Sequence, residues 1–223
     1  MVKKIIVIAP HPDDETLGCG GTLLKYKSNN FEINWLIITD IKKEDGWSEK
    51  IVKQRESEIN RIKKFYNFKN VFRLNFSTAL LDQASRKLII GKISKIFKKI
   101  KPNILYMPYG GDIHSDHKIV FECSLSASKN FRQTSIEEIN CYETLSETEF
   151  ASSNIKEKFD PNFFVDITNF LKKKITAFSF YKSEQMKKNF PRNKIAIKAL
   201  ARYRGSRIGV SYAEAFSQIL RIN

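Results

Sequence analysis

APHPDDETLG, residues 9–18, directly follows the apolar run IIVI at residues 5–8. The run has the length and β-branched composition of a buried strand. Open α/β sheets place their chemistry at the carboxyl ends of such strands. One imidazole and three carboxylates fall within residues 11–15, and they predict a metal or acid–base site at this strand end. A solvated acidic turn is the alternative interpretation.

The other two histidines of the chain lie together in a second cluster, Asp112-Ile113-His114-Ser115-Asp116-His117. This cluster also follows an apolar run, at residues 104–107, and the chain has only three histidines in all. Because the carboxyl ends of parallel strands meet at one edge of a sheet, we expect the two clusters to lie close together. Imidazole and carboxylate groups are typical zinc ligands, so a shared metal site is predicted.

Apolar runs and amphipathic segments alternate along the chain. Strands are expected at residues 5–9, 35–39, 71–74, 104–107 and 139–144. Helices are expected at residues 22–27, 51–66, 88–100, 118–122 and 171–178. This order predicts a single Rossmann-like α/β domain over residues 1–223, with a mostly parallel sheet and helices on both faces. The loop at residues 40–46 is expected to form part of the site rim.

The composition is that of a soluble globular protein, with 42% apolar and 28% charged residues, but the net charge of +15 is unusually high. It predicts an anionic partner. Three scattered cysteines argue against a disulfide framework and favour the reducing cytoplasm. No run approaches the roughly 18 apolar residues of a membrane-spanning helix, so no transmembrane segment is expected.

Basic residues are concentrated between Lys187 and Arg207, where they alternate with Phe190 and Tyr203. Such a stretch can bind polyanions, but no nucleic-acid fold signature accompanies it. We therefore expect phosphate groups on a small or lipid-linked substrate rather than nucleic acid. A solvated charged face has the same composition and remains the alternative.

The two histidine clusters together resemble the signature motifs of the LmbE/PIG-L superfamily of zinc-dependent de-N-acetylases. The resemblance extends to Arg55-Glu56-Ser57-Glu58 and to Arg204-Gly205 with residues 212–216, so it covers essentially the whole chain. It implies an enzyme that removes the N-acetyl group from a GlcNAc-type amino sugar or sugar conjugate and releases acetate.

The matching motif positions also imply roles for individual residues. The expected Zn²⁺ ligands are His11, Asp14 and His117. Asp13 would be the general base that takes a proton from water. His114 would stabilise the oxyanion or act as an acid, with Asp116 fixing its tautomer. The residues expected to bind the substrate are Arg55, Tyr142 and Arg204.

Two other functions remain open at this point. A non-catalytic protein could use its basic surface to hold nucleic acid or an anionic membrane, and its histidines would then be dispensable. A metal-dependent phosphoesterase is the alternative among enzymes. It would usually need more carboxylate ligands for a second metal than the two motifs provide.

Overall fold

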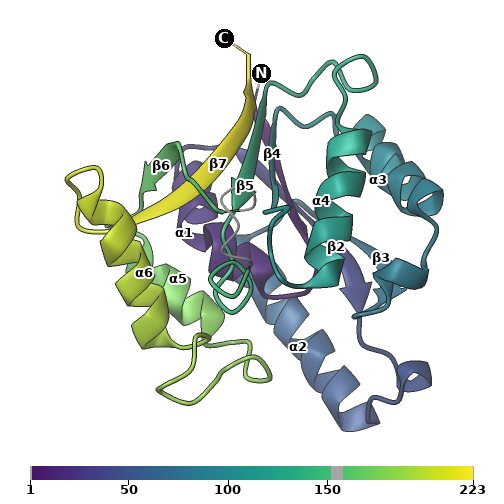
Figure 1. Ribbon diagram of the computed structural model, residues 1–223, viewed down its shortest axis with the longest axis horizontal. Coiled ribbons are helices and arrows are strands. Elements are labelled where there is room, and N and C mark those ends of the chain that lie inside the picture. Colours follow the sequence, from purple (N-terminus) through teal and green to yellow (C-terminus); the bar gives the residue numbers. More distant parts are fainter. Residues whose placement is uncertain (1, 152–157, 223) are drawn as a thin grey trace.

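A seven-stranded sheet forms the centre of the computed structural model, which describes residues 2–151 and 158–222 (Figure 1). The strands are β1 (Lys4–Ala9), β2 (Glu32–Asp40), β3 (Asn70–Ser77), β4 (Ile104–Pro108), β5 (Glu138–Tyr142), β6 (Phe163–Asp166) and β7 (Ala213–Arg221). Their order across the sheet is β3-β2-β1-β4-β5-β7-β6. The five strands from β3 to β5 pair in parallel, and β7 pairs antiparallel with both β5 and β6. The predicted α/β class with a mostly parallel sheet is confirmed.

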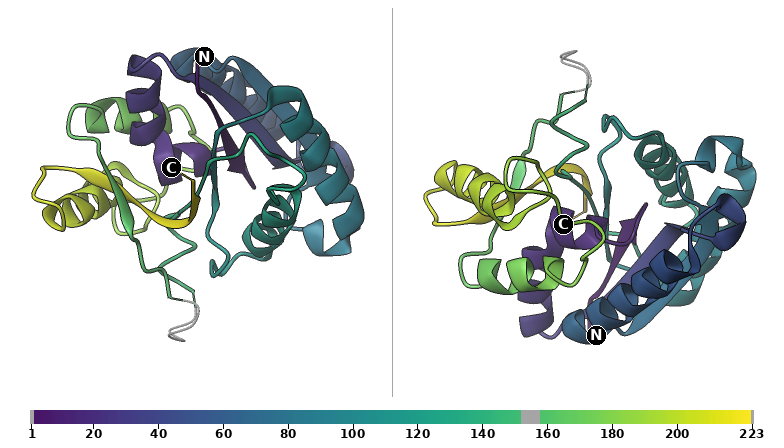
Figure 2. Two further views of the ribbon diagram at one scale, coloured as in Figure 1. Left: turned by 90° about the horizontal axis from the view of Figure 1, so that it is seen from above. Right: turned by 90° about the horizontal axis from the view of Figure 1, so that it is seen from below.

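Helices cover both faces of the sheet, as the sequence predicts (Figure 2). One face carries α1 (Asp14–Ser28), α2 (Glu49–Tyr66), α5 (Leu171–Phe178) and α6 (Lys194–Ser206). The other face carries α3 (Arg86–Ile100) and α4 (Ser115–Ala127). Two short 3-10 helices, η1 (Lys43–Asp45) and η2 (Leu81–Gln83), lie in the loops after β2 and β3. Within residues 2–151 and 158–222, none of these helices combines the length and the apolar character needed to cross a bilayer.

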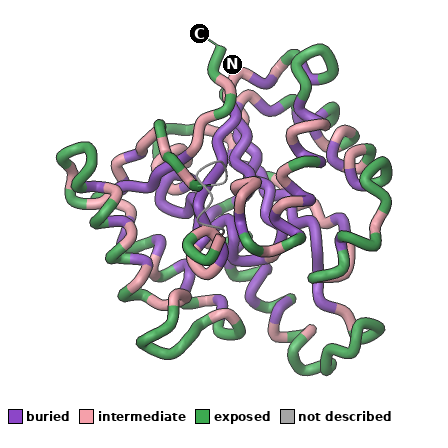
Figure 3. Tube along the Cα trace, viewed as in Figure 1, coloured by how far each residue is buried: buried purple, intermediate pink, exposed green. Residues whose placement is uncertain are grey.

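The side chains of strand β1 show why helices must cover both faces of the sheet. Ile5, Val7 and Ala9 pack into the core on the side of α1 and α2, whereas Ile6 and Ile8 pack on the side of α3 and α4. All five side chains are fully buried, and Figure 3 shows the central strands as buried along most of their length. Side chains alternate between the faces of a strand, so a strand covered on both faces must be apolar throughout.

The two histidine clusters meet where the direction of the chain across the sheet reverses. From β1 the chain runs outward through β2 to β3, and it then returns to β4 on the opposite side of β1. Loops that leave neighbouring strands on opposite sides open a crevice at this point, which is where open α/β sheets bind ligands. The expected meeting of the two motifs at one sheet edge is confirmed.

Helix α1 begins at Asp14, inside the stretch that the sequence pattern assigns to a loop, and it is kinked at Cys19. The Glu214 carboxylate on β7 accepts the backbone N–H groups of Gly21 and Thr22 at 2.8 and 2.7 Å. The buried Lys174 ammonium donates to Glu214 at 2.6 Å and to the Leu17 carbonyl at 2.7 Å. The kink frees backbone groups that α5 and β7 satisfy, and the start of α1 is thereby fixed beside the site.

Two helical glycines provide a matched test of this packing. A Cβ on Gly205 in α6 would lie 2.7 Å from the carbonyl oxygen of Val210 and 2.9 Å from the Cα of Tyr212, whereas a Cβ on Gly91 in α3 would meet nothing within 4 Å. We expect Gly205→Ala to lower the free energy of unfolding by about 1–3 kcal/mol, because backbone atoms cannot yield as a side chain can. Gly91→Ala should raise it by roughly 0.5–1 kcal/mol. Urea unfolding measures both, and equal effects would contradict the packing described for α6.

Candidate metal centre and catalytic pocket

The first motif leaves β1 through a strained turn. Asp13 has φ 134° and ψ −27°, a backbone conformation that residues with a Cβ rarely adopt. The Asp14 carboxylate accepts the backbone N–H of His11 at 2.8 Å, and the Glu15 carboxylate accepts that of Asp13 at 3.1 Å. Glu15 is itself held by the hydroxyl groups of Thr16 and Tyr181. These bonds stabilise the turn that brings His11, Asp13 and Asp14 together.

His11, Asp14 and His117 offer three ligand atoms within 4.8 Å of one another. His117 Nε2 lies 3.3 Å from Asp14 Oδ2, and His11 Nδ1 lies 3.4 Å from the same oxygen. His117 is fully buried, and its Nε2 makes no hydrogen bond within the described part of the chain. A buried ring nitrogen without a partner costs free energy, and a cation among these three atoms would satisfy it. Two imidazoles and one carboxylate form a donor set that fits zinc.

Two further carboxylates contact the ring nitrogens of His117 and His11 that do not face Asp14. Asp112 Oδ2 lies 2.8 Å from His117 Nδ1, and the Thr148 hydroxyl donates to Asp112 Oδ1 at 2.6 Å. Asp116 Oδ2 lies 3.1 Å from His11 Nε2. Such contacts orient an imidazole so that its other nitrogen is free for a metal. Asp112 is a candidate site residue that our sequence interpretation missed, although its place five residues before His117 in the second cluster was a usable signal.

The structure corrects the predicted partner of Asp116. Its carboxylate contacts His11, together with the backbone N–H groups of Ala79 and Leu81, and not His114. His114 instead caps α4, where its Nδ1 accepts the backbone N–H of Asp116 at 3.1 Å. The neutral ring therefore carries its proton on Nε2 and keeps a donor for a ligand. Burial lowers the pKa of His114, as do the nearby rings of His11 and His117, so the neutral form is favoured.

The candidate ligands His117 and Asp14 shift each other's pKa values. Burial lowers the pKa of His117, but the carboxylates of Asp14 and Asp112 outweigh burial and raise it to about 10. Burial raises the pKa of Asp14, but His117 and His11 outweigh burial and hold it well below its usual value. A metal must therefore displace a proton from His117, and its affinity should fall as the pH falls.

Asp13, the expected general base, lies beside these ligands and is only 1% exposed. Burial raises its pKa well above the usual value, the guanidinium of Arg192 opposes this rise, and the Glu184 carboxylate adds to it. Arg192 Nη1 is 3.3 Å from Asp13 Oδ2. A carboxylate with a raised pKa takes up a proton more readily than an ordinary aspartate, which suits a general base.

A cavity of about 160 Å³ opens beside the first motif, and its wall includes His11, Asp13 and His114. Asp40, Ile41 and Trp47 also line it, so the end of β2 and the loop after it contribute to the wall of this cavity, as expected for a site rim. Trp47 is 41% exposed and presents an aromatic surface to the cavity. An apolar ring beside a few polar groups is typical of small-molecule sites.

The three residues expected to bind substrate have different surroundings. Arg55 lines the cavity, but its guanidinium donates to the Pro12 carbonyl at 2.8 Å and pairs with Glu184. Its immediate role is to support the first motif. Arg204 binds Glu143 at 2.6 and 2.8 Å and lines a separate cavity of about 490 Å³ that contains none of the histidines. The structure does not bring Arg204 to the candidate metal centre.

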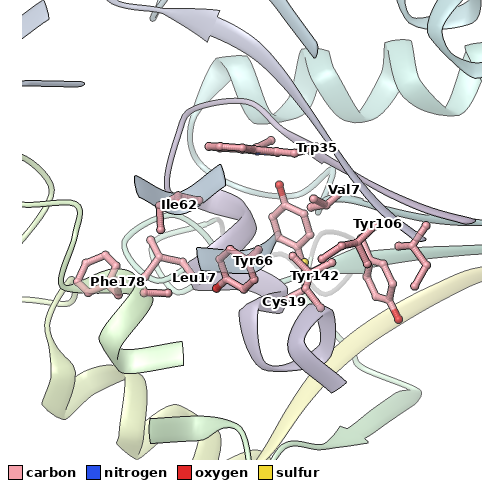
Figure 4. Packing of buried hydrophobic residues seen from close by; sticks show 14 of the residues in the cluster. Val7, Leu17, Cys19, Trp35, Ile62, Tyr66, Tyr106, Tyr142 and Phe178 are labelled. Carbon is pink, nitrogen blue, oxygen red and sulfur yellow. The ribbon is translucent and has the colours of Figure 1, made fainter. Parts of the chain in front are cut away.

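The expectation for Tyr142 is wrong. Its side chain is fully buried at the end of β5, in the core on the side of α1, where Figure 4 shows it among the packed aromatic residues. Its hydroxyl donates to the carbonyl of Ile8 at 2.8 Å, and its ring occupies the place that a Cβ on Gly18 would need. A tyrosine that closes the core in this way has no surface left for a substrate.

Comparison with known families agrees with this geometry. The family model for PIG-L, described as GlcNAc-PI de-N-acetylase, matches residues 6–128, which is more than half of the chain and includes both histidine clusters. The chain belongs to the PIG-L family. The resemblance inferred from the two motifs is therefore confirmed.

Several known proteins are similar to this PIG-L family member along nearly its whole length. It is 25% identical to diacetylchitobiose deacetylase of Thermococcus kodakarensis over an alignment of 236 residues, which covers 96% of the chain and 82% of that protein. The conserved protein TT1542 of Thermus thermophilus has a crystal structure that matches with a TM-score of 0.78 at 26% identity, covering 100% of this chain and 97% of that one.

The same fold also carries a different reaction. GalB, the 4-carboxy-2-hydroxymuconate hydratase of Pseudomonas putida, matches with a TM-score of 0.77 at 12% identity and covers 100% of this chain and 98% of that one. A shared fold does not establish an activity. The activity of this PIG-L family member must therefore be argued from its site.

Proposed function

We propose that this protein is a metal-dependent hydrolase that removes the N-acetyl group from a GlcNAc-type sugar or sugar conjugate, releasing acetate and a free amine. The observation that carries the proposal is the fully buried Nε2 of His117, which makes no hydrogen bond within the described residues and lies 3.3 Å from Asp14 Oδ2. The buried carboxylate of Asp13 lines the adjacent cavity. Membership of the PIG-L family and the likeness to a diacetylchitobiose deacetylase support the choice of reaction.

Zinc is the metal that we propose, with His11, Asp14 and His117 as its ligands. Bound there, zinc supplies a Lewis acid that lowers the pKa of a water molecule and polarises an amide carbonyl. Asp112 and Asp116 keep the two imidazole rings in the orientation that presents a free nitrogen to it.

The chain itself supplies the proton transfers. Asp13 takes a proton from the attacking water and later delivers it to the nitrogen of the departing amino sugar, and its raised pKa suits it to both steps. His114 donates its Nε2 proton in a hydrogen bond to the oxygen that becomes negative when the amide carbon turns tetrahedral. We propose that Trp47 packs against the sugar ring.

The lining of the cavity bears on the charge of the substrate. Its charged residues are Asp13, Asp40, Glu184, Arg55 and Arg192. Both guanidinium groups are already paired with Glu184. The cavity is therefore not basic, and it does not support the expectation of an anionic group bound there. We propose that the sugar ring in the cavity is uncharged and that the exposed basic residues between Lys187 and Arg207 meet any charged part of a conjugate.

An assay of acetate release tests this function. We expect the zinc-loaded protein to release acetate and an equal amount of free amine from diacetylchitobiose or N-acetylglucosamine, because Asp13 and His114 both line the cavity that we propose to hold the amide. A nucleotide-linked N-acetylglucosamine should be tested in parallel. Release of phosphate from phosphate esters, without acetate from any sugar, would instead favour the phosphoesterase alternative.

A further inference from the structure

Arg192 lies 179 positions away from Asp13 in the sequence, yet its guanidinium contacts the Asp13 carboxylate at 3.3 Å. The guanidinium has other protein partners as well. Nη1 donates to Glu184 at 2.8 Å, Nη2 donates to Glu147 at 2.8 Å, and Nε donates to the Ser146 hydroxyl at 2.7 Å. Its side chain is 15% exposed. Arg192 therefore joins three separate segments of the chain at the wall of the cavity.

Other contacts fix both the backbone next to Arg192 and its partner Glu184. Asn193 caps α6 by accepting the backbone N–H groups of Ile195 and Ala196, so Arg192 directly precedes a fixed helix start. Glu184 also pairs with Arg55, which in turn donates to the carbonyl of Pro12, next to Asp13. Because a guanidinium is planar and its five N–H groups point in fixed directions, contacts with Ser146, Glu147 and Glu184 determine where the second N–H of Nη1 points.

The contact with Arg192 is important for the position of the Asp13 carboxylate. Among the residues that the structure describes, no other side chain donates a hydrogen bond to this carboxylate. The Asp13 backbone is in a strained conformation with φ 134°, which the surrounding contacts must maintain. Three of the groups around Arg192 are carboxylates that already use its donors. The guanidinium is thus committed to protein acceptors and is not a free anion site for a substrate.

We propose that Arg192 is a positioning residue, which holds the Asp13 carboxylate in the orientation that general-base catalysis requires. The inference rests on the proposed function, because it takes Asp13 to be the base. It assigns no contact between Arg192 and the substrate. Small errors in the placement of a reacting group can cost about a hundredfold in rate, so a residue that only orients the base can have a large effect on turnover.

The test compares Arg192→Ala and Arg192→Lys with Arg61→Ala, which removes an exposed arginine of α2. We expect Arg192→Ala to retain its zinc, to lose roughly 10- to 100-fold in kcat for acetate release, and to keep KM within about twofold. Lysine should not restore the rate, because it lacks the planar fork. Added guanidinium ion should recover part of kcat in Arg192→Ala and have no such effect on the wild type or Arg61→Ala.

A crystal structure of Arg192→Ala gives a readout that does not depend on activity. We expect the Asp13 carboxylate to leave its present position or to occupy more than one rotamer, with His11, Asp14 and His117 unmoved. Should Arg192→Ala fail to fold, the same structure and kinetics for Arg192→Lys decide the matter. A raised KM with normal kcat, or an unmoved Asp13 with normal kcat, would overturn the inference. Absence of acetate release by the wild type would instead refute the proposed function.

Discussion

His117→Ala is expected to abolish metal binding by the purified protein. His117 contributes one of three candidate ligands, and its buried Nε2 lacks a hydrogen-bond partner within the described residues. Two remaining ligands do not make a closed zinc site. Elemental analysis of the variant and the wild type, purified in parallel and dialysed against the same buffer, should show about one zinc per wild-type chain and almost none in the variant.

Two other substitutions serve as controls for this result. Asp112→Asn leaves all three ligands in place but changes the carboxylate that orients His117, so we expect zinc affinity to fall by roughly 10- to 100-fold and not to vanish. His114→Ala should keep its zinc, because the ring of His114 is committed to the start of α4. A full complement of zinc in His117→Ala would show that the metal is bound elsewhere.

Asp13→Asn should separate the base from the ligands. We expect this variant to keep its zinc and to lose about 10²- to 10⁴-fold in kcat, which is the usual contribution of a general base. An amide cannot accept the proton that the Asp13 carboxylate takes, although it has nearly the same size. Steady-state acetate release measures kcat, and metal analysis of the same samples shows whether the site is intact.

The neighbouring carboxylate provides the matched control. Asp14→Asn changes an oxygen that lies 3.3 and 3.4 Å from the two imidazoles, so it should weaken zinc binding first and activity as a consequence. If Asp13→Asn lost the metal and Asp14→Asn kept it, the assignment of base and ligand would have to be exchanged.

The parallel part of the fold could be predicted because its strands are buried on both faces. Ile5 to Ile8 read as an uninterrupted apolar run, and the same holds for Ile104 to Met107. The antiparallel edge could not be predicted in this way. β7 carries Glu214 in a buried position, where Lys174 from α5 neutralises it, so its sequence lacks the pattern of a core strand.

Residues of the candidate site were predictable where the motif itself places them. His11, Asp14 and His117 come together because two short loops leave adjacent parallel strands. Asp116 is different, because α4 begins at Ser115, the carboxylate contacts His11, and only the backbone N–H of Asp116 donates to His114. Side-chain direction in the first turn of a helix depends on where that helix begins, which spacing alone does not determine.

The contacts of the C-terminal part depend on tertiary structure. Arg192 appeared in the sequence as one member of a basic run, and nothing in that run distinguishes it from exposed neighbours such as Lys188 or Lys194. Its burial follows from the position of Glu184 and Glu147 on other segments. Tyr142 shows the reverse case, since the family resemblance suggested a substrate-binding residue but the ring fills the core.

The most direct test of a metal-dependent de-N-acetylase is the zinc dependence of acetate release by the wild-type protein. The protein is stripped with a chelator and dialysed, and zinc is then added back in steps while acetate from diacetylchitobiose is measured. We predict negligible release by the stripped protein and a rise that saturates near one zinc per chain, with no recovery in His117→Ala. Acetate release by the fully stripped protein at the rate of the zinc-loaded one would contradict the account.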